Sequence, residues 1–599
     1  MASAPARFEE PQVQRAPIPA FPQRREGEKR AASATEDWLD LCITIWVEAP
    51  AWADQIMVDS TLMPKRLTRC PFPLTQSIPI FLFIALPWLN PFALGPTPAA
   101  VPLLFSWACA AVLLAIWRPG SDPDRLRAGR WLPAMAWAWL AAGLISSGIG
   151  LCQYFGVASS FSPWMSSSGL GEAFANLRQR NQFATLTSLS LAALLWLGAT
   201  GRFAGRRQSL MWFAACLLAA GNAASSSRTG LMQLGLLAAL WWLWGGWRQP
   251  LVRRLLLLAL AAYAVAMLAL PWLAGLDLSA QGMFARLRTG DPLCASRLTL
   301  WSNVLQLIGQ KPWLGWGWGE LDYAHFITPY DGPRFCEILD NAHNLPLHLA
   351  VELGIPVALL LCGAFAWWVL RQRPWGETAP ARQLAWGVLA VVGLHSLLEY
   401  PLWYGPFQMA AGLCVILLWR GTDVDVDVAP EYQSKRPLSQ VIRTLSAIVF
   451  IAFISFAAWD YHRISQIYLS PPARQAAYRD DTMEKIRDSW LFRNQVRFAE
   501  LSVTPLTPDN AQWTFDTATM LLHYSPEPRV IEKAIESAVM LGRDEDALQY
   551  LARYRAAFPK DHARWAKENA EAERLSVQEG RLHGRAVQTA HSSRVLALA

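Results

Sequence analysis

The segment Ile338-Leu-Asp-Asn-Ala-His343-Asn344 ends a polar loop that begins at Leu276, and it runs directly into the apolar stretch Leu345–Leu370. Long apolar stretches also precede the loop. A histidine at the mouth of a membrane helix lies at the boundary between water and lipid. There it is able to take a proton from an acceptor while a lipid-borne donor lies alongside. The alternative is that His343 only caps a helix or completes a hydrogen bond within the loop.

The composition of the chain is that of a membrane protein. Of its 599 residues, 53% are hydrophobic and 17% are charged, whereas about a quarter of the residues in soluble proteins are charged. Residues 79–419 are mostly apolar, but residues 1–70 and 461–599 are not. This pattern predicts a polytopic membrane protein with a soluble segment at each end. The net charge of +7 does not indicate nucleic acid, because the arginines cluster in short loops between apolar stretches.

About twenty apolar residues are needed to cross a bilayer. The sequence therefore predicts an all-α bundle of about 11–12 membrane spans. Eleven spans are expected near residues 78–94, 99–117, 131–151, 182–200, 209–224, 229–247, 255–274, 345–370, 383–400, 404–419 and 440–460.

The distribution of basic residues predicts the orientation of these spans. Alternate loops are rich in arginine, as cytoplasmic loops are, and the other short loops carry only Arg178, Arg180 and Arg228. This alternation puts the loop 276–344 and the C-terminal segment outside the cytoplasm. Cys294 and Cys336 both lie in that loop, so we expect them to form a disulfide.

Several outer-face arginines run against the topological bias, which suggests that they have another role. Four of them are candidates for binding phosphate: Arg180, Arg228, Arg288 and Arg297. A guanidinium group binds phosphate oxygens through two parallel hydrogen bonds, so this set suits a pyrophosphate carried on a lipid. The alternative is that each arginine reaches lipid headgroups from a helix end.

A second outer-face cluster follows His395 and includes Glu399 and Tyr404. A carboxylate at a membrane boundary is costly unless it is paired, so Glu399 is expected to meet an arginine or line a wet cavity. The alternative is that this aromatic-rich segment only anchors the chain at the interface. The acidic run Asp423–Asp427 is more simply a solvated linker than a metal site, and no metal or other cofactor is predicted.

Four regions are expected along the chain. Residues 1–70 are expected to form a disordered extension, and Met63 would make a natural alternative start just before the first span. Residues 74–460 form the membrane domain with its loop, residues 461–575 form a soluble helical domain, and residues 576–599 form a disordered tail. Within the soluble domain, Ala534–Leu541 and Glu545–Phe558 resemble a tetratricopeptide-type helix hairpin, a fold that binds or braces partners.

Several short motifs together resemble the O-antigen ligase and polymerase superfamily. They are Gln179-Arg-Asn-Gln-Phe183, Ser227-Arg-Thr-Gly230, Lys311-Pro-Trp-Leu-Gly-Trp-Gly-Trp-Gly319, Asp340-Asn-Ala-His343-Asn344 and Leu398-Glu-Tyr-Pro-Leu-Trp-Tyr404. Among its members they are most similar to PglL-type bacterial protein O-oligosaccharyltransferases. The resemblance covers roughly residues 74–570.

The resemblance implies en bloc transfer of a preassembled oligosaccharide from undecaprenyl pyrophosphate to Ser or Thr hydroxyls of periplasmic proteins. The enzyme would lie in the bacterial inner membrane with its active site facing the periplasm. The resemblance makes His343 the essential histidine, with Gln179 and Tyr404 as its partners. Asp340, Asn341, Asn344 and Glu399 would support the site, and the four outer-face arginines would hold the pyrophosphate. Such a reaction needs no metal and inverts the anomeric centre.

Three other functions remain open at this stage. A ligase that transfers O-antigen to the lipid A core would use the same site with a sugar hydroxyl as acceptor. An O-antigen polymerase would join glycan repeats to one another. A transporter of lipid-linked glycan would need polar residues within its spans, and these spans have few.

Overall fold

The computed structural model describes residues 74–93, 95–116, 124–203, 208–277, 282–289, 292–419 and 437–582. Every regular element within these ranges is a helix, as the sequence predicts. The predicted extension 1–70 with its start at Met63, the acidic run Asp423–Asp427 and the last residues, 583–599, lie outside the described residues.

The apolar stretches of the sequence form long helices. These are α2 (Leu74–Leu89), α3 (Ala100–Ile116), α4 (Asp124–Tyr154), α5 (Arg180–Ala199), α6 (Gln208–Ala224), α7 (Arg228–Leu243), α8 (Pro250–Leu273), α13 (Ile355–Gln372), α14 (Pro380–Ser396), α15 (Gly405–Trp419) and α16 (Pro437–Ser465). Among the described residues, five segments are long and apolar enough to cross a membrane: Trp131–Tyr154, Arg180–Ala199, Pro250–Leu273, Ile355–Gly376 and Val441–Tyr468. The chain is therefore a multi-pass membrane protein, while the full number of spans stays a prediction.

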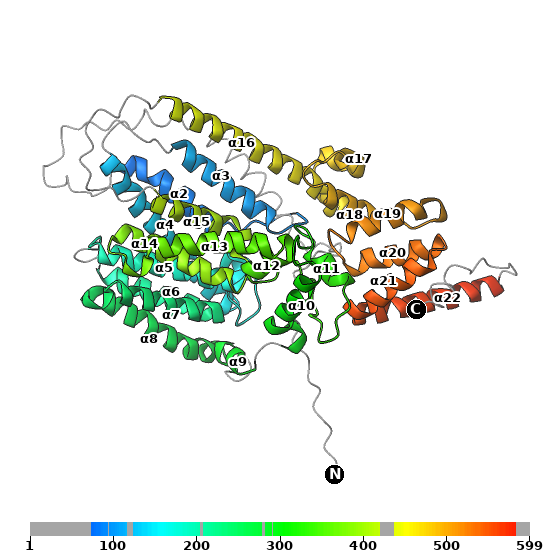
Figure 1. Cartoon of the computed structure of the whole chain (residues 1–599), viewed down its shortest axis with the longest axis horizontal. Coiled ribbons are helices and arrows are strands. Elements are labelled where there is room, and N and C mark those ends of the chain that lie inside the picture. Colours follow the sequence, from blue (N-terminus) through cyan, green and yellow to red (C-terminus); the bar gives the residue numbers. More distant parts are fainter. Residues whose placement is uncertain are drawn as a thin grey trace, which may run out of the picture. The chain divides into compact units, whose positions relative to one another are not determined.

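Helix α5 is the central helix of this bundle. It contacts α4, α6, α7, α8 and α14, and Figure 1 shows several of these helices side by side. The apolar window of α5 is 94% buried. The Ser190 hydroxyl of α5 donates to the Trp139 carbonyl of α4 at 2.6 Å, a contact typical of closely packed membrane helices. Because α5 is surrounded, residues at its N-terminal end are held in defined positions.

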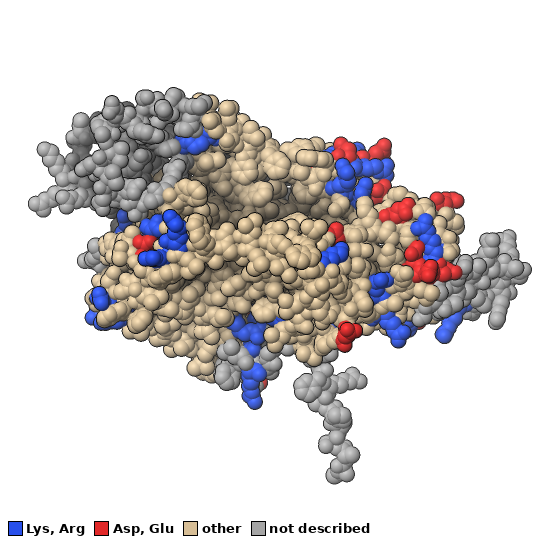
Figure 2. Space-filling model, in the orientation of Figure 1, with Lys and Arg blue, Asp and Glu red and all other residues tan. Residues whose placement is uncertain are grey.

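The outer surface of the apolar helices suits lipid. Figure 2 shows a broad uncharged face over them, with Lys, Arg, Asp and Glu mostly at its margins. Leu359 and Leu360 of α13 and Val265 of α8 are among the large apolar side chains exposed on these helices. Contiguous apolar surface of this extent marks an interaction site, and on long apolar helices its natural partner is the bilayer.

The predicted span Leu345–Leu370 is wrong at its start, because two helices occupy it. Helix α12 (Leu345–Leu353) and α13 meet at Gly354, whose φ of +86° ends the first helix. Helix α12 buries the polar side chains of His348 and Glu352, which suit a protein interior better than lipid. The segment that is long and apolar enough to cross a membrane begins at Ile355 instead.

The loop before α12 is folded rather than irregular. It contains α9 (Gly282–Thr289), α10 (Arg297–Gln310) and α11 (Leu321–Ile327). Apolar side chains of α10, α11, α12 and the segment between α11 and α12 share one small core. It is made by Leu300, Val304, Leu307, Ile308, Leu321, Ala324, Phe335, Leu339, Ala342 and Val351. The loop therefore presents His343 from a packed scaffold.

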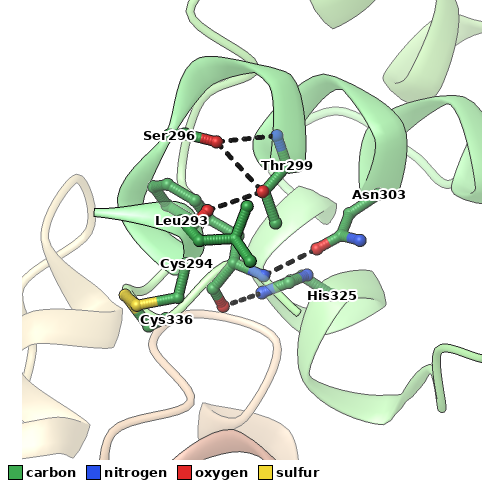
Figure 3. The surroundings of a disulfide bond; sticks show 8 residues. Leu293, Cys294, Ser296, Thr299, Asn303, His325 and Cys336 are labelled. Atoms are coloured by element: carbon green, nitrogen blue, oxygen red, sulfur yellow. Dashed lines mark hydrogen bonds between the residues drawn. A yellow bond between two sulfur atoms is a disulfide. The ribbon is translucent and has the colours of Figure 1, made fainter. Parts of the chain in front are cut away.

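A disulfide joins Cys294 to Cys336, the pairing expected from the sequence, with the Cα atoms 5.3 Å apart. Figure 3 shows its surroundings. The Phe335 N–H donates to Asn303 Oδ1 at 2.8 Å, and the Phe335 carbonyl lies 3.1 Å from His325 Nε2. Burial lowers the pKa of His325 to about 3, so this histidine is neutral and structural. These contacts hold the segment that leads to His343 against α10 and α11.

The C-terminal region is also helical. It includes α18 (Arg493–Val503), α19 (Ala511–Leu521), α20 (Pro528–Met540), α21 (Asp544–Ala557) and α22 (Pro559–Leu582). From α19 onward, each helix contacts the next. The predicted hairpin corresponds to α20 and α21, joined at Gly542, whose φ of +73° makes the turn. Helix α22 continues past residue 575, where the helical domain was expected to end.

The chain divides into two compact units. One unit contains residues 95–98 and 459–499 of the described chain, and the other contains the remaining described residues. In the smaller unit, buried Asp460 accepts hydrogen bonds from Arg463, Ser489 and the Leu491 N–H. The predicted soluble domain 461–575 therefore falls across both units.

Candidate active site

Four polar side chains converge on the carboxylate of Glu399. His343 Nδ1 donates to Glu399 Oε2 at 2.6 Å. Gln179 Nε2 donates to the same oxygen at 3.3 Å, and Asn181 Nδ2 donates to Oε1 at 3.2 Å. The Arg297 guanidinium forms an ion pair with Oε1. The Glu399 side chain is only 4% exposed, so this carboxylate is the buried centre of the cluster.

The cluster forms where the ends of four helices meet. Gln179 is the N-cap of α5, Arg297 is the first residue of α10, and Glu399 follows the end of α14. His343 directly precedes Asn344, the N-cap of α12. Helix ends carry unpaired backbone groups and short polar side chains, so they bring several hydrogen-bonding residues to one place.

The backbone of His343 is held in an uncommon conformation. Its φ is +50°, in the left-handed region that few residues other than glycine adopt. The side chain of Asn341 stabilises this turn, because its Oδ1 accepts the His343 N–H at 2.9 Å. Asn344 caps α12 through the Leu347 N–H and donates to the Leu397 carbonyl at 3.0 Å. Both asparagines therefore help to fix the backbone around His343.

The electrostatics of the cluster favour an ionised Glu399. Burial alone would raise the pKa of this carboxyl group. The hydrogen bond from His343 and the charges of His343 and Arg297 outweigh burial and lower the pKa of Glu399. An ionised Glu399 holds the proton of His343 on Nδ1, because a carboxylate only accepts hydrogen bonds. When the ring is uncharged, Nε2 is therefore the nitrogen without a proton, and it is able to accept one.

Two tyrosines extend the cluster. The rings of His343 and Tyr400 meet edge to face with centroids 4.9 Å apart. Tyr400 stacks on Tyr404 with centroids 5.9 Å apart. Tyr404, expected as a catalytic residue, therefore adjoins His343 through the ring of Tyr400.

The four predicted phosphate-binding arginines differ in their surroundings. Arg297 lies in the cluster, and its side chain is 33% exposed. Arg180 forms an ion pair with Glu172. Arg228 is the first residue of α7, directly after Ser227. Arg288 is exposed near the end of α9, and no contact described for it joins it to the cluster. Asp340, expected as a supporting residue, is exposed next to the Asn341 turn.

Asn181 was not predicted as a site residue from the sequence. Its amide joins Glu399 to Ser227, whose hydroxyl donates to Asn181 Oδ1 at 2.6 Å. Ser227 also caps α7 by accepting the Gly230 N–H. The sequence did contain a sign of this role, because Asn181 and Ser227 both lie in the short motifs on which the resemblance rests.

A buried polar chain lies behind the cluster within the bundle. Thr185 Oγ1 is 2.9 Å from His395 Nδ1 and accepts from Gln233 Nε2 at 2.8 Å. Thr185 also donates to the Asn181 carbonyl at 2.8 Å. Polar residues inside a membrane bundle are expensive and mark functional regions. This chain ties α5, α7 and α14 together beneath Glu399.

The described residues contain no group of three or more His, Cys, Asp and Glu side chains arranged to hold a metal ion. The chemistry of the cluster is that of a histidine base with a carboxylate partner, beside the guanidinium group of Arg297. Such a set is able to deprotonate a hydroxyl group next to an anionic leaving group.

Three family models match parts of the chain. Residues 213–362 match a model described as O-antigen ligase, and residues 383–573 match one described as virulence factor membrane-bound polymerase, C-terminal. Residues 173–197, which include Gln179 and Arg180, match a model described as protein glycosylation ligase.

Two curated proteins of Acinetobacter baylyi are similar to the chain. A general O-oligosaccharyltransferase is 22% identical over 470 residues, which cover 77% of this chain and 78% of that protein. A ComP-specific O-oligosaccharyltransferase is 26% identical over 284 residues, which cover 47% of this chain and 50% of that protein. No solved structure matches the chain. The motifs and these matches agree, and the chain is similar to PglL-like members of the O-antigen ligase superfamily.

Proposed function

We propose that this protein is an oligosaccharyltransferase that moves a preassembled glycan, en bloc, onto Ser and Thr hydroxyls of other proteins. The observation that carries the proposal is the convergence of His343, Gln179 and Arg297 on buried Glu399. The similarity to two protein O-oligosaccharyltransferases supports the same reaction class.

In this mechanism His343 acts as the general base. Its Nδ1 proton is held by Glu399, so its free Nε2 takes the proton of the acceptor hydroxyl as the oxygen attacks the anomeric carbon. Ionised Glu399 stabilises the imidazolium that forms, as the buried carboxylate does in a Ser-His-Asp triad. Attack on the face opposite the leaving group inverts the anomeric centre.

The donor is an undecaprenyl pyrophosphate glycan, and arginines stabilise its pyrophosphate as it departs. Arg297 is the best-placed candidate, because a guanidinium group has five N–H donors and its side chain is one-third exposed. Arg180 and Arg228 are proposed to contribute from the starts of α5 and α7. Arg288 is proposed to contribute from the end of α9.

The proposed orientation puts the active site in the periplasm and the protein in the bacterial inner membrane. The loop 276–344 and the helices that follow α16 then lie on the periplasmic side. The alternation of basic loops along the sequence supports this orientation. A disulfide within the loop fits an oxidising compartment. We further propose that the helix pairs from α19 to α22 act as a tetratricopeptide-like surface that binds the acceptor protein.

Two other reactions use the same chemistry, and each is supported by one of the matching family models. The O-antigen ligase model favours transfer to the lipid A core, and the polymerase model favours joining of glycan repeats. Deletion of the gene separates the three. Under our proposal the deletion strain loses glycan from periplasmic proteins and keeps its O-antigen ladder on a lipopolysaccharide gel. Loss of the ladder with intact protein glycans would make the protein a lipopolysaccharide ligase.

A further inference from the structure

Two large apolar side chains project from the loop between α10 and α11. Trp313 is 75% exposed and Leu314 is 86% exposed. They belong to the segment Lys311–Gly319, which is rich in Trp and Gly. Exposed apolar side chains of this size in adjacent positions indicate a partner surface rather than contact with water.

The backbone of this segment is fastened to the start of the membrane helix α13. The Ile355 N–H, in the first residue of α13, donates to the Pro312 carbonyl at 2.8 Å. The Trp316 N–H donates to the Val351 carbonyl at 2.8 Å, and the Gly317 N–H donates to the Glu352 carbonyl at 3.0 Å. Three hydrogen bonds therefore align the segment with the junction between α12 and α13.

Glycines make this close approach possible. A Cβ atom on Gly354 would overlap the Trp313 carbonyl, and one on Gly315 would overlap the Glu352 carbonyl. Both residues also have positive φ values, which glycine adopts at little cost. The segment is thus fixed in position against the junction.

The position of α13 in the bilayer determines how deep Trp313 and Leu314 lie relative to the membrane surface. The segment Ile355–Gly376 is apolar and only 6% buried within the protein, so its surface is the one that meets lipid. Leu359 and Leu360, one turn past its start, are 67% and 70% exposed. Because the Pro312 carbonyl is bonded to the first residue of this helix, Trp313 and Leu314 lie beside the point where the chain enters the bilayer.

We propose that Trp313 and Leu314 insert into the membrane surface and anchor the catalytic loop there. Tryptophan suits this position, because its amphipathic ring favours the headgroup level of a bilayer. The lipid contact stands independently of the reaction that the enzyme performs.

The anchor would fix the distance between His343 and the membrane surface. His343 lies at the N-terminal end of α12, and the anchoring segment is bonded to its C-terminal end. Helix α12 has nine residues, a length of about 13 Å at 1.5 Å per residue. A short rigid helix between anchor and histidine suits a donor whose pyrophosphate is confined to the level of the lipid headgroups.

The test uses the full-length protein in nanodiscs that contain lipids brominated in their acyl chains. A cysteine is introduced by Leu314→Cys, and an environment-sensitive fluorophore is attached to it. Leu305→Cys is the matched control, because Leu305 is also exposed, at 56%, but lies on α10 and not in the segment Lys311–Gly319. The signal of the labelled parent protein, which has its native cysteines, is subtracted from both.

The expected result is blue-shifted emission and strong quenching by brominated lipid at position 314, with neither at position 305. Equal quenching at the two positions would overturn the proposal. Blue-shifted emission at position 314 without lipid quenching would also overturn it, because another protein surface would then cover the site. Gly363→Cys, at an open position on α13, confirms that the assay reports lipid contact.

Discussion

At the scale of single residues, Glu399 organises the site. Its carboxylate accepts hydrogen bonds from His343, Gln179, Asn181 and Arg297, which lie 56, 220, 218 and 102 positions away in the sequence. His343 and the arginine were predicted individually from their residue types and their place in the chain, and Gln179 came from the resemblance. That they share one carboxylate was not predictable, because no local pattern encodes contacts over such separations. The same is true of Asn181, whose role depends on two distant partners.

Replacing Glu399 by Gln is expected to lower glycan transfer by about 10²- to 10⁴-fold, because the His343 ring would lose the partner that orients it and stabilises its charged form. The assay is transfer from the lipid-linked donor to an acceptor protein. Glu377→Gln is the control, because Glu377 also pairs with an arginine, Arg382, but lies outside the site. Equal transfer by wild type and Glu399→Gln would contradict the role given to this carboxylate.

The pKa of Glu399 also predicts a pH dependence of stability. Because its pKa is lowered in the folded protein, its stabilising contribution is present above the unfolded value of about 4.3. That contribution is lost as the pH falls through the lower folded value. The difference in melting temperature between wild type and Glu399→Gln should thus be largest near neutral pH and shrink below about pH 4. A difference that grows on acidification would contradict the lowered pKa.

At the scale of elements, apolar length predicted most of the helices, but not the break at Gly354. The stretch Leu345–Leu370 is continuous enough in hydropathy to suggest one span. His348, Glu352 and the Gly354-Ile-Pro356 sequence were the local signs of an interruption. The packing of Lys311–Gly319 against the junction gives the interruption its structural reason, and that packing is a tertiary feature.

Replacing Gly354 by Ala should destabilise the protein by about 1–3 kcal/mol or more, since φ and ψ of +86° and 160° suit glycine. The added Cβ would also overlap the Trp313 carbonyl. Gly363→Ala, which meets open space on α13, should be neutral or slightly stabilising. Thermal unfolding of both purified variants measures the effect, and equal melting temperatures would show that the junction is not tightly packed.

The buried carboxyl group of Asp322 in α11 allows a second test at this scale. Burial raises the pKa of Asp322 to about 8, so its carboxyl group is protonated at neutral pH. An unfolded Asp ionises near pH 4, so folding stability should decline as the pH rises from about 4 toward 8. Asp322→Asn removes this decline and should raise the melting temperature at pH 8 while leaving it nearly unchanged near pH 4. No gain at pH 8 would contradict the burial of this carboxyl group.

At the scale of the larger unit, the C-terminal helices contact the catalytic loop. His523, after α19, stacks on Tyr323 of α11 with ring centroids 3.7 Å apart and contacts Glu320 at 2.7 Å. Arg553 of α21 donates to the Ile327 carbonyl at 3.0 Å. The sequence predicted a helical C-terminal region, but not these contacts, which join partly exposed residues that follow no local sequence pattern. They indicate that this region braces the loop in addition to any binding of an acceptor.

The double variant His523→Ala, Arg553→Ala is expected to expose the loop to proteolysis and to lower transfer. Lys567→Ala, an exposed change on α22, is the control. Limited proteolysis with peptide mapping of residues 292–344 reports the bracing. Unchanged protection together with a raised KM for the acceptor protein would assign these helices to acceptor binding alone.

The central claim is that His343, held by Glu399, is the base for glycan transfer to protein hydroxyls. The most direct measurement supplies the purified enzyme in lipid with an undecaprenyl pyrophosphate glycan and an acceptor protein, and compares wild type with His343→Ala. The account predicts that wild type attaches glycan to Ser or Thr, with chelators having no effect, and that His343→Ala loses at least about 10²-fold in rate. Near-normal transfer by correctly inserted His343→Ala protein would contradict it.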